Sequence, residues 1–141
     1  MKLSSVVIVL LLLSGGVVAG DIAISDGRVR ETIPGQTVSA GYLRIVNKSS
    51  DPCVLHGVSS AAAGKVEVHE HRHQDGKMSM REVVNLAVDA KASVLFEPGG
   101  YHLMLLNLSQ PLAKGDTVAV NFDFGDCGAV MEKFPVVAIG D

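Results

Sequence analysis

Short runs of alternating apolar and polar residues, separated by turn residues, make up the sequence after its first twenty positions. Val118, Val120 and Phe122 illustrate the alternation, because Asn121 and Asp123 fall on the opposite face of the same run. A period of two is typical of a strand with one buried face. The turn signals recur roughly every 8–12 residues, at Asp26-Gly27, Pro34-Gly35, Asn47 to Pro52, Asp75-Gly76, Pro98-Gly99-Gly100, Lys114-Gly115-Asp116 and Gly125-Asp126. The pattern therefore predicts an all-β chain.

Nine short strands are expected between these turns. They cover residues 27–32, 39–47, 54–59, 65–72, 77–83, 93–97, 102–106, 117–124 and 129–137. No stretch shows a helical period with capping residues at both ends. Eight or nine strands at this spacing predict a two-sheet β-sandwich with Greek-key connections. Because repeats and linkers are absent, residues 20–141 are expected to form a single domain.

The N-terminal segment predicts an export signal. Lys2 supplies a positive charge, residues 6–13 form an unbroken apolar run, and small residues at 17–20 follow a Ser-Gly-Gly break. This order is typical of a secretory signal peptide, with cleavage expected after Ala19. The alternative is an uncleaved membrane anchor, but the run is well short of the ~20 residues that a spanning helix needs. We expect residues 1–19 to be removed and the mature protein to be exported, without stable membrane insertion.

The net charge of the chain argues against nucleic acid as a partner. Lys+Arg number 12 and Asp+Glu number 15, so the formal charge is 12 − 15 = −3. Nucleic-acid binders need a basic surface, and this chain does not carry one. No arrangement of a nucleophile and a base stands out either, so the sequence predicts a binding protein that is not an enzyme.

The two cysteines, Cys53 and Cys127, fit an oxidising compartment. A disulfide between them would span 74 positions, and such a loop is worth about 4 kcal/mol in the chain-entropy description. A redox pair usually has its two cysteines close together, so a structural disulfide is favoured. Two unpaired thiols remain the alternative.

Histidine and methionine gather in a predicted hairpin. Asp75-Gly76 is a strong two-residue turn signal, and a hairpin around it pairs positions that sum to 151. Because side chains alternate along a strand, one face of the hairpin would then carry five potential ligands, which are His69, His71, His73, Met78 and Met80.

A second cluster follows the Pro98-Gly99-Gly100 turn. His102 and Met104 lie two positions apart in an apolar run, and therefore share a face if that run is a strand. Imidazole with thioether is a ligand set without fixed negative charge, which suits Cu(I). Calcium and magnesium want oxygen ligands, and zinc gains little from methionine.

Each of these residues also has an ordinary interpretation. Met104 could fill the core, His71 and His73 could be solvated hairpin residues, and His56 is expected to be structural or on the surface. Four of the five histidines nevertheless fall in the two short segments, together with three of the four methionines that follow the leader. The occurrence of so many histidines and methionines in the same two segments therefore favours a metal site.

These residues resemble the signature of the PCu(A)C family of periplasmic copper chaperones. That signature is a His, ten residues, a Met, twenty-one residues and then His-x-Met. Here positions 70–79 separate His69 from Met80, and positions 81–101 separate Met80 from the segment His102-Leu103-Met104. The likeness extends roughly over residues 37–137.

The resemblance implies a cupredoxin-like β-sandwich that binds Cu(I) through His69, Met80, His102 and Met104. It also implies a periplasmic protein that delivers copper toward the Cu(A) site of cytochrome c oxidase. We expect the protein to be a monomer. The partner would be a copper-accepting oxidase subunit or another copper chaperone. Transfer would proceed by ligand exchange.

The sequence departs from the family pattern at one position of the hairpin. Family members commonly have a Met two residues after the first His, where this chain has His71. Together with His73, that residue could support a secondary Cu(II) site. The alternative function is therefore a periplasmic copper or zinc storage or sensing protein that uses the His69–His73 cluster. A blue-copper electron carrier is disfavoured because no His follows shortly after Cys127.

Overall fold

The fold was analysed in a computed structural model that describes residues 20–141. The predicted signal peptide, residues 1–19, lies outside the described residues. Within residues 20–141 no helix is long and apolar enough to cross a membrane.

Eleven strands and one short 3-10 helix make up the described chain, which confirms the all-β prediction. The elements are β1 (Ile22–Arg30), β2 (Ser39–Asn47), β3 (Cys53–Leu55), β4 (Gly57–Ser59), β5 (Ala63–Gln74), β6 (Lys77–Glu82), β7 (Leu86–Val88), β8 (Ser93–Phe96), β9 (Tyr101–Leu108), β10 (Thr117–Asp123), η1 (Gly125–Cys127) and β11 (Ala129–Val137).

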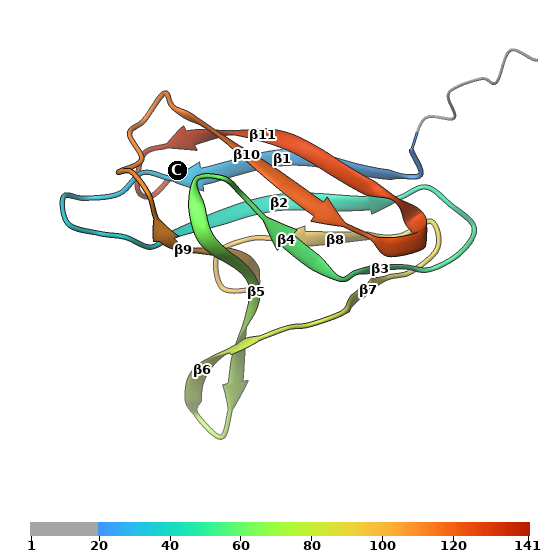
Figure 1. The fold of residues 1–141 in the computed structure, drawn as a ribbon. Coiled ribbons are helices and arrows are strands. Elements are labelled where there is room, and N and C mark those ends of the chain that lie inside the picture. The colour runs from blue at the N-terminus through green and yellow to red at the C-terminus, as the bar shows by residue number, and fades with distance from the viewer. Residues whose placement is uncertain (1–19) are drawn as a thin grey trace, which may run out of the picture.

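Nine of these strands share one sheet, in the order β4-β10-β11-β1-β2-β8-β9-β5-β6. Additional pairings join β2 to β9 and β4 to β5, so the sheet closes on itself. Strands β3 and β7 form a separate two-stranded sheet. Figure 1 shows the outer part of β5 and all of β6 projecting away from the other strands. We call residues 69–82 the hairpin and the remaining strands the body.

The core of the body is built from alternating residues, as the sequence pattern predicts. On β10, Val118, Val120 and Phe122 are buried and the residues between them are exposed. Strand β11 pairs with β10 in antiparallel register and brings Phe134 to the same interior, where its ring centroid lies 6.0 Å from that of Phe122.

Three local features differ from the predicted elements, and the first is strand β7, which none of the predicted strands covers. The run at 54–59 is split at His56, because β3 pairs with β7 whereas β4 pairs with β10 and β5. The Asp26-Gly27 signal is an irregularity inside β1, where the register shifts between Ser25 and Arg28, and it is not a turn between strands. A Cβ atom at Gly27 would collide with the ring of Phe134, so the bulge brings the backbone close to the core at a position that glycine fills.

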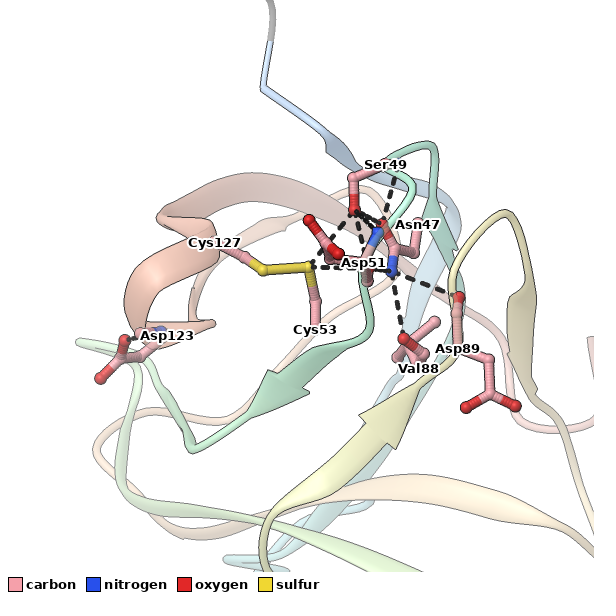
Figure 2. The surroundings of a disulfide bond; sticks show 9 residues. Asn47, Ser49, Asp51, Cys53, Val88, Asp89, Asp123 and Cys127 are labelled. Atoms are coloured by element: carbon pink, nitrogen blue, oxygen red, sulfur yellow. Dashed lines mark hydrogen bonds between the residues drawn. A yellow bond between two sulfur atoms is a disulfide. The ribbon is translucent and has the colours of Figure 1, made fainter.

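The Cys53–Cys127 disulfide is formed, as the sequence favoured, and it ties β3 to the short helix η1. Beside it lies Asn47, whose side chain is fully buried and fully hydrogen-bonded (Figure 2). The Asn47 amide nitrogen donates to the carbonyl of Asp51 at 2.8 Å and to that of Val88 at 3.1 Å. Its oxygen accepts from the backbone and the hydroxyl of Ser49. This network fixes the loop that carries Cys53.

Candidate metal centre

The hairpin has the register that the Asp75-Gly76 turn predicts. His69 pairs with Glu82, and the next two same-face pairs along the hairpin are His71 with Met80 and His73 with Met78. Both turn residues have positive φ, 53° at Asp75 and 74° at Gly76, as a two-residue hairpin turn requires. The five potential ligands therefore share one face.

Strand β9 brings the second cluster to that face. His102 lies directly opposite His69, and Met104 lies opposite Glu67, one same-face position further along β5. The ring centroids of His69 and His102 are 5.8 Å apart. Three of the four predicted ligands, His69, His102 and Met104, are thus brought together on two neighbouring strands.

The fourth predicted ligand, Met80, lies one strand further out. It is directly opposite His71 and diagonal to His69, a relation that leaves Cβ atoms about 7–8 Å apart. Its side chain is 51% exposed. Met80 therefore lies on the neighbouring strand, at the edge of the group formed by His69, His102 and Met104.

Burial and one backbone contact prepare His102 to bind a metal. The side chain is 3% exposed, and Nδ1 lies 3.2 Å from the carbonyl oxygen of Gly100. A carbonyl can only accept, so Nδ1 carries the proton and Nε2 keeps the lone pair. Burial lowers the pKa of His102, against the opposing effect of the Gly100 hydrogen bond. The neutral form, which metal binding requires, is thereby favoured.

His69 is oriented by a carboxylate that the sequence reasoning missed. Its Nε2 donates to Glu67 at 2.7 Å, and the other Glu67 oxygen contacts the Lys65 ammonium at 2.7 Å. These hydrogen bonds, the Lys65 bond first, lower the pKa of Glu67. The Nδ1 atom of His69 is buried and has no hydrogen-bond partner in the described part of the chain. The alternation of side chains along a strand could have identified Glu67, because it is two positions before His69 and therefore on the same face.

His71 is closer to the centre than its position in the hairpin suggests. Its ring centroid lies 5.0 Å from that of His102, a shorter distance than the 5.8 Å between His69 and His102. Its backbone N–H also points to the carbonyl of Gly100, at 3.4 Å. His71 is therefore part of the centre, although the four-residue signature does not include it.

Met104 lines a cavity of about 210 Å³ together with residues of β1, β2 and the C-terminal segment, including Arg30, Ala40 and Ile139. Its side chain is half-buried. The adjacent core position, Leu103, is fully buried on the opposite face of β9. Met104 therefore faces this cavity, on the same face of β9 as His102, and does not fill the core.

Arg30 of β1 lies beside the centre, where it lines the same cavity as Met104. The guanidinium groups of Arg28 and Arg30 lie 5.1 Å and 5.0 Å from the centroid of the buried Tyr42 ring. The charge of Arg30 also contributes to lowering the pKa of His102.

Within residues 20–141, no group of three or more His, Cys, Asp or Glu side chains is arranged to hold a metal ion. The donors that β5 and β9 place side by side at this centre are the imidazoles of His69 and His102 and the thioether of Met104. That donor set fits Cu(I) better than zinc, calcium or magnesium.

His56 and Met131, the remaining histidine and methionine considered above, lie away from the centre. His56 is exposed, with Nδ1 3.2 Å from the side-chain oxygen of Asn85, as expected for a surface residue. Met131 lies on β11 opposite Asn121 and is 57% exposed.

Comparison with known proteins finds a family model and a relative that match most of this chain. The model of a family described as "Putative lipoprotein LpqE-like" matches residues 22–136. A protein of Leifsonia xyli subsp. xyli named "Putative lipoprotein Lxx21020" is 28% identical over 119 residues, which are 84% of this chain and 70% of that protein.

Two solved structures extend the comparison. The copper-bound PCuAC domain from PmoF2 is 25% identical and superimposes with a TM-score of 0.71, over 86% of this chain and 96% of that domain. The solution structure of CuI-DR1885 from Deinococcus radiodurans is 24% identical with a TM-score of 0.67, over 87% of this chain and 82% of that one. The second likeness concerns the fold alone.

Proposed function

Because the chain belongs to the LpqE-like family, a family of the PCuAC type, we propose that it is an exported copper chaperone that binds Cu(I) and passes it on. The ligands are His69, Met80, His102 and Met104. The protein binds and transfers the ion and carries out no catalysis. The cupredoxin-like Greek-key description of the fold belongs to the same proposal.

The observation that carries the proposal is the state of the two facing imidazoles. In each, one nitrogen donates to a protein acceptor, which is Glu67 for His69 and the Gly100 carbonyl for His102. The other nitrogen keeps its lone pair, Nδ1 in His69 and Nε2 in His102. Such outer hydrogen bonds orient metal-binding histidines. Met104, beside them on the same face, adds the soft donor that selects Cu(I).

The position of Met80 suits delivery. His102 and Met104 lie on the body and His69 lies at the base of the hairpin, where β5 still pairs with β9, whereas Met80 lies on the projecting strand β6 and is half exposed. All four donors are uncharged when the histidines are neutral, so no fixed negative charge holds the ion. A partner's ligand can therefore replace Met80 first and the remaining donors afterwards, without release of free copper.

The compartment and the acceptor follow from the same proposal. We place the protein in the periplasm, with cleavage of the signal near Ala19. The Cys53–Cys127 disulfide supports an oxidising compartment, and the relatives named as lipoproteins are of an exported class. The acceptor is the Cu(A) site of cytochrome c oxidase, reached through an oxidase subunit or another copper chaperone.

A second candidate function is copper storage or sensing through the His69–His73 cluster. The observation that favours it is the 5.0 Å separation of the His71 and His102 rings. Cu(II) prefers nitrogen over thioether donors. His69, His71 and His102 would have to change rotamer to share such an ion, because the described residues hold no three side chains of this kind already arranged around a metal position. The double variant His71→Ala/His73→Ala tests it, because Cu(II) affinity and nitrogen hyperfine structure should then fall while Cu(I) binding changes little.

A competitive Cu(I) titration of the mature protein tests the main proposal. We expect one tightly bound Cu(I) per chain, and a lower affinity for a Met104→Leu variant, which preserves side-chain volume and apolarity. Met131→Leu is the matched control, since Met131 lies on β11 away from the centre. Unchanged affinity in a folded Met104→Leu protein would remove Met104 from the ligand set. Transfer of the bound ion to a purified Cu(A) domain tests the delivery step.

A further inference from the structure

The outermost same-face pair of the hairpin is not used by the proposed site. His73 lies directly opposite Met78, next to the Asp75-Gly76 turn. Met78 is 61% exposed and His73 is exposed. Directly opposed side chains have Cβ atoms about 4.5–5.5 Å apart, so one imidazole and one thioether can meet at a single ion there.

The two faces of the hairpin carry different chemistry. On one face Glu70 accepts from Arg72 at 3.0 Å and from Arg81 at 2.9 Å, which joins β5 to β6 by ion pairs. The other face holds no ion pair between β5 and β6 among the described residues and instead carries the histidines and methionines; its His69–Glu67 contact lies within β5, at the base of the hairpin. The charged face stiffens the hairpin, and the His/Met face has no packing role that explains its residues.

Same-face pairs succeed one another from the tip to the body. His73 with Met78 is followed by His71 with Met80, and each step along a strand covers roughly 6.5–7 Å. The ring of His71 then lies 5.0 Å from that of His102, whose side chain is only 3% exposed. Exposure therefore decreases in steps from the tip toward the proposed site, with an imidazole available at every step.

A second exposed methionine provides the contrast. Met131 is 57% exposed, almost as much as Met78, but it lies on β11 opposite Asn121. It has no imidazole across the strand pair. Any behaviour of Met78 that Met131 does not share therefore depends on the His73 pairing and not on an exposed thioether as such.

We propose that His73 and Met78 form a second, weaker Cu(I) site at the tip of the hairpin, through which copper is loaded into the inner site. The ion moves from His73 and Met78 to His71 and Met80, and from there to His69, His102 and Met104. Each step exchanges one neutral donor for another, so the ion stays Cu(I) and no electron or proton is transferred. This inference rests on the proposed chaperone function.

Methionine methyl NMR distinguishes the two sites. The mature protein is titrated anaerobically with Cu(I) supplied as its acetonitrile complex, and the ε-methyl signals of Met78, Met80, Met104 and Met131 are followed. We expect the first equivalent to shift Met80 and Met104, and further Cu(I) to shift Met78 in a saturable manner while Met131 stays in place. If Met78 moves no more than Met131, the tip site is absent. If Met80 and Met104 do not move, the proposed function itself fails.

A rate measurement tests the path. Stopped-flow loading from a coloured Cu(I) chelate is compared for the wild type, His73→Ala/Met78→Leu and Met131→Leu. We expect the double variant to load roughly tenfold more slowly, with the same affinity at the inner site, and the Met131→Leu control to load like the wild type. Equal loading rates for the double variant and the wild type would overturn the role of the tip in loading.

Discussion

The body and the hairpin differ in what holds them together. On β10 of the body every second residue is buried, whereas every residue of β6 in the hairpin is exposed. Strand β5 belongs to both regions, and its residues His69 and Glu70 pair with β9 on one side and with β6 on the other. The proposed copper site lies at this junction. Burial therefore maintains the fold in one region, and the other region is free to carry exposed donors.

The largest effect expected from this contrast is on stability. Phe122 is fully buried against Phe134, so Phe122→Ala should lower the free energy of unfolding by about 3–5 kcal/mol. Met80→Ala in the hairpin should change it by no more than about 0.5 kcal/mol, as is usual for exposed positions. Denaturant unfolding of the two apo variants measures both values. A similar loss of unfolding free energy in both variants would contradict the proposal that burial stabilises the body and not the hairpin.

Reduction of the disulfide is expected to have the next largest effect. The Cys53–Cys127 bond closes a loop of 74 positions in the body, and its loss should cost about 2–4 kcal/mol. Because neither cysteine lies in the hairpin, Cu(I) affinity should be retained wherever the reduced protein is still folded. Thermal unfolding with and without a reductant, followed by a Cu(I) titration of the folded sample, checks both parts.

The carboxylate at the junction should matter for the metal and less for the fold. Glu67→Ala removes the acceptor that orients His69, and loss of such an outer partner typically weakens metal binding by about 10–100-fold. Glu132→Ala, at an exposed position on β11, is the control and should bind Cu(I) like the wild type. An unchanged affinity in Glu67→Ala would mean that the His69 ring is held by other contacts.

The smallest effect concerns pH. Burial lowers the pKa of His102 below its ordinary value, which is about 6.5, so the folded apo protein binds fewer protons than the unfolded chain. Its stability should therefore decline as pH falls below about 6.5. Cu(I) affinity should fall in the same direction, because protons compete for the imidazoles. NMR titration should show His102 losing its proton below the usual range, and an ordinary or raised pKa would contradict its burial.

Local signals allowed much of the fold to be predicted. The Asp75-Gly76 turn was enough to set the hairpin register, because turn type and loop length fix the pairing. The likeness to PCuAC proteins was also visible in the spacing of His69, Met80 and the His102 segment, and it is confirmed by the comparisons. The metal-binding role of the four residues stays a prediction.

Non-local contacts account for what the sequence did not reveal. The break at His56 and the short strand β7 depend on which sheet each segment joins, and no local period contains that information. The nearness of His71 to His102 likewise arises from the packing of β5 beside β9. Glu67 was visible to the alternation rule, but its role became clear only from its contacts with His69 and Lys65.

The closure of the sheet has a consequence for the order in which the chain can fold. Strand β1 pairs in parallel with β11, the last strand, through Val29 with Val136 and Arg30 with Val137. A chain that emerges N-terminus first cannot close the sheet until residues 129–137 have emerged. In the same way, Cys53 cannot form its disulfide until Cys127 has emerged. Pairings between strands so distant in sequence typically form in roughly milliseconds to seconds. Until then the unpaired edges of β1 and β10 are open to other chains, so the last strand to emerge is the one that ends the period of exposure to aggregation.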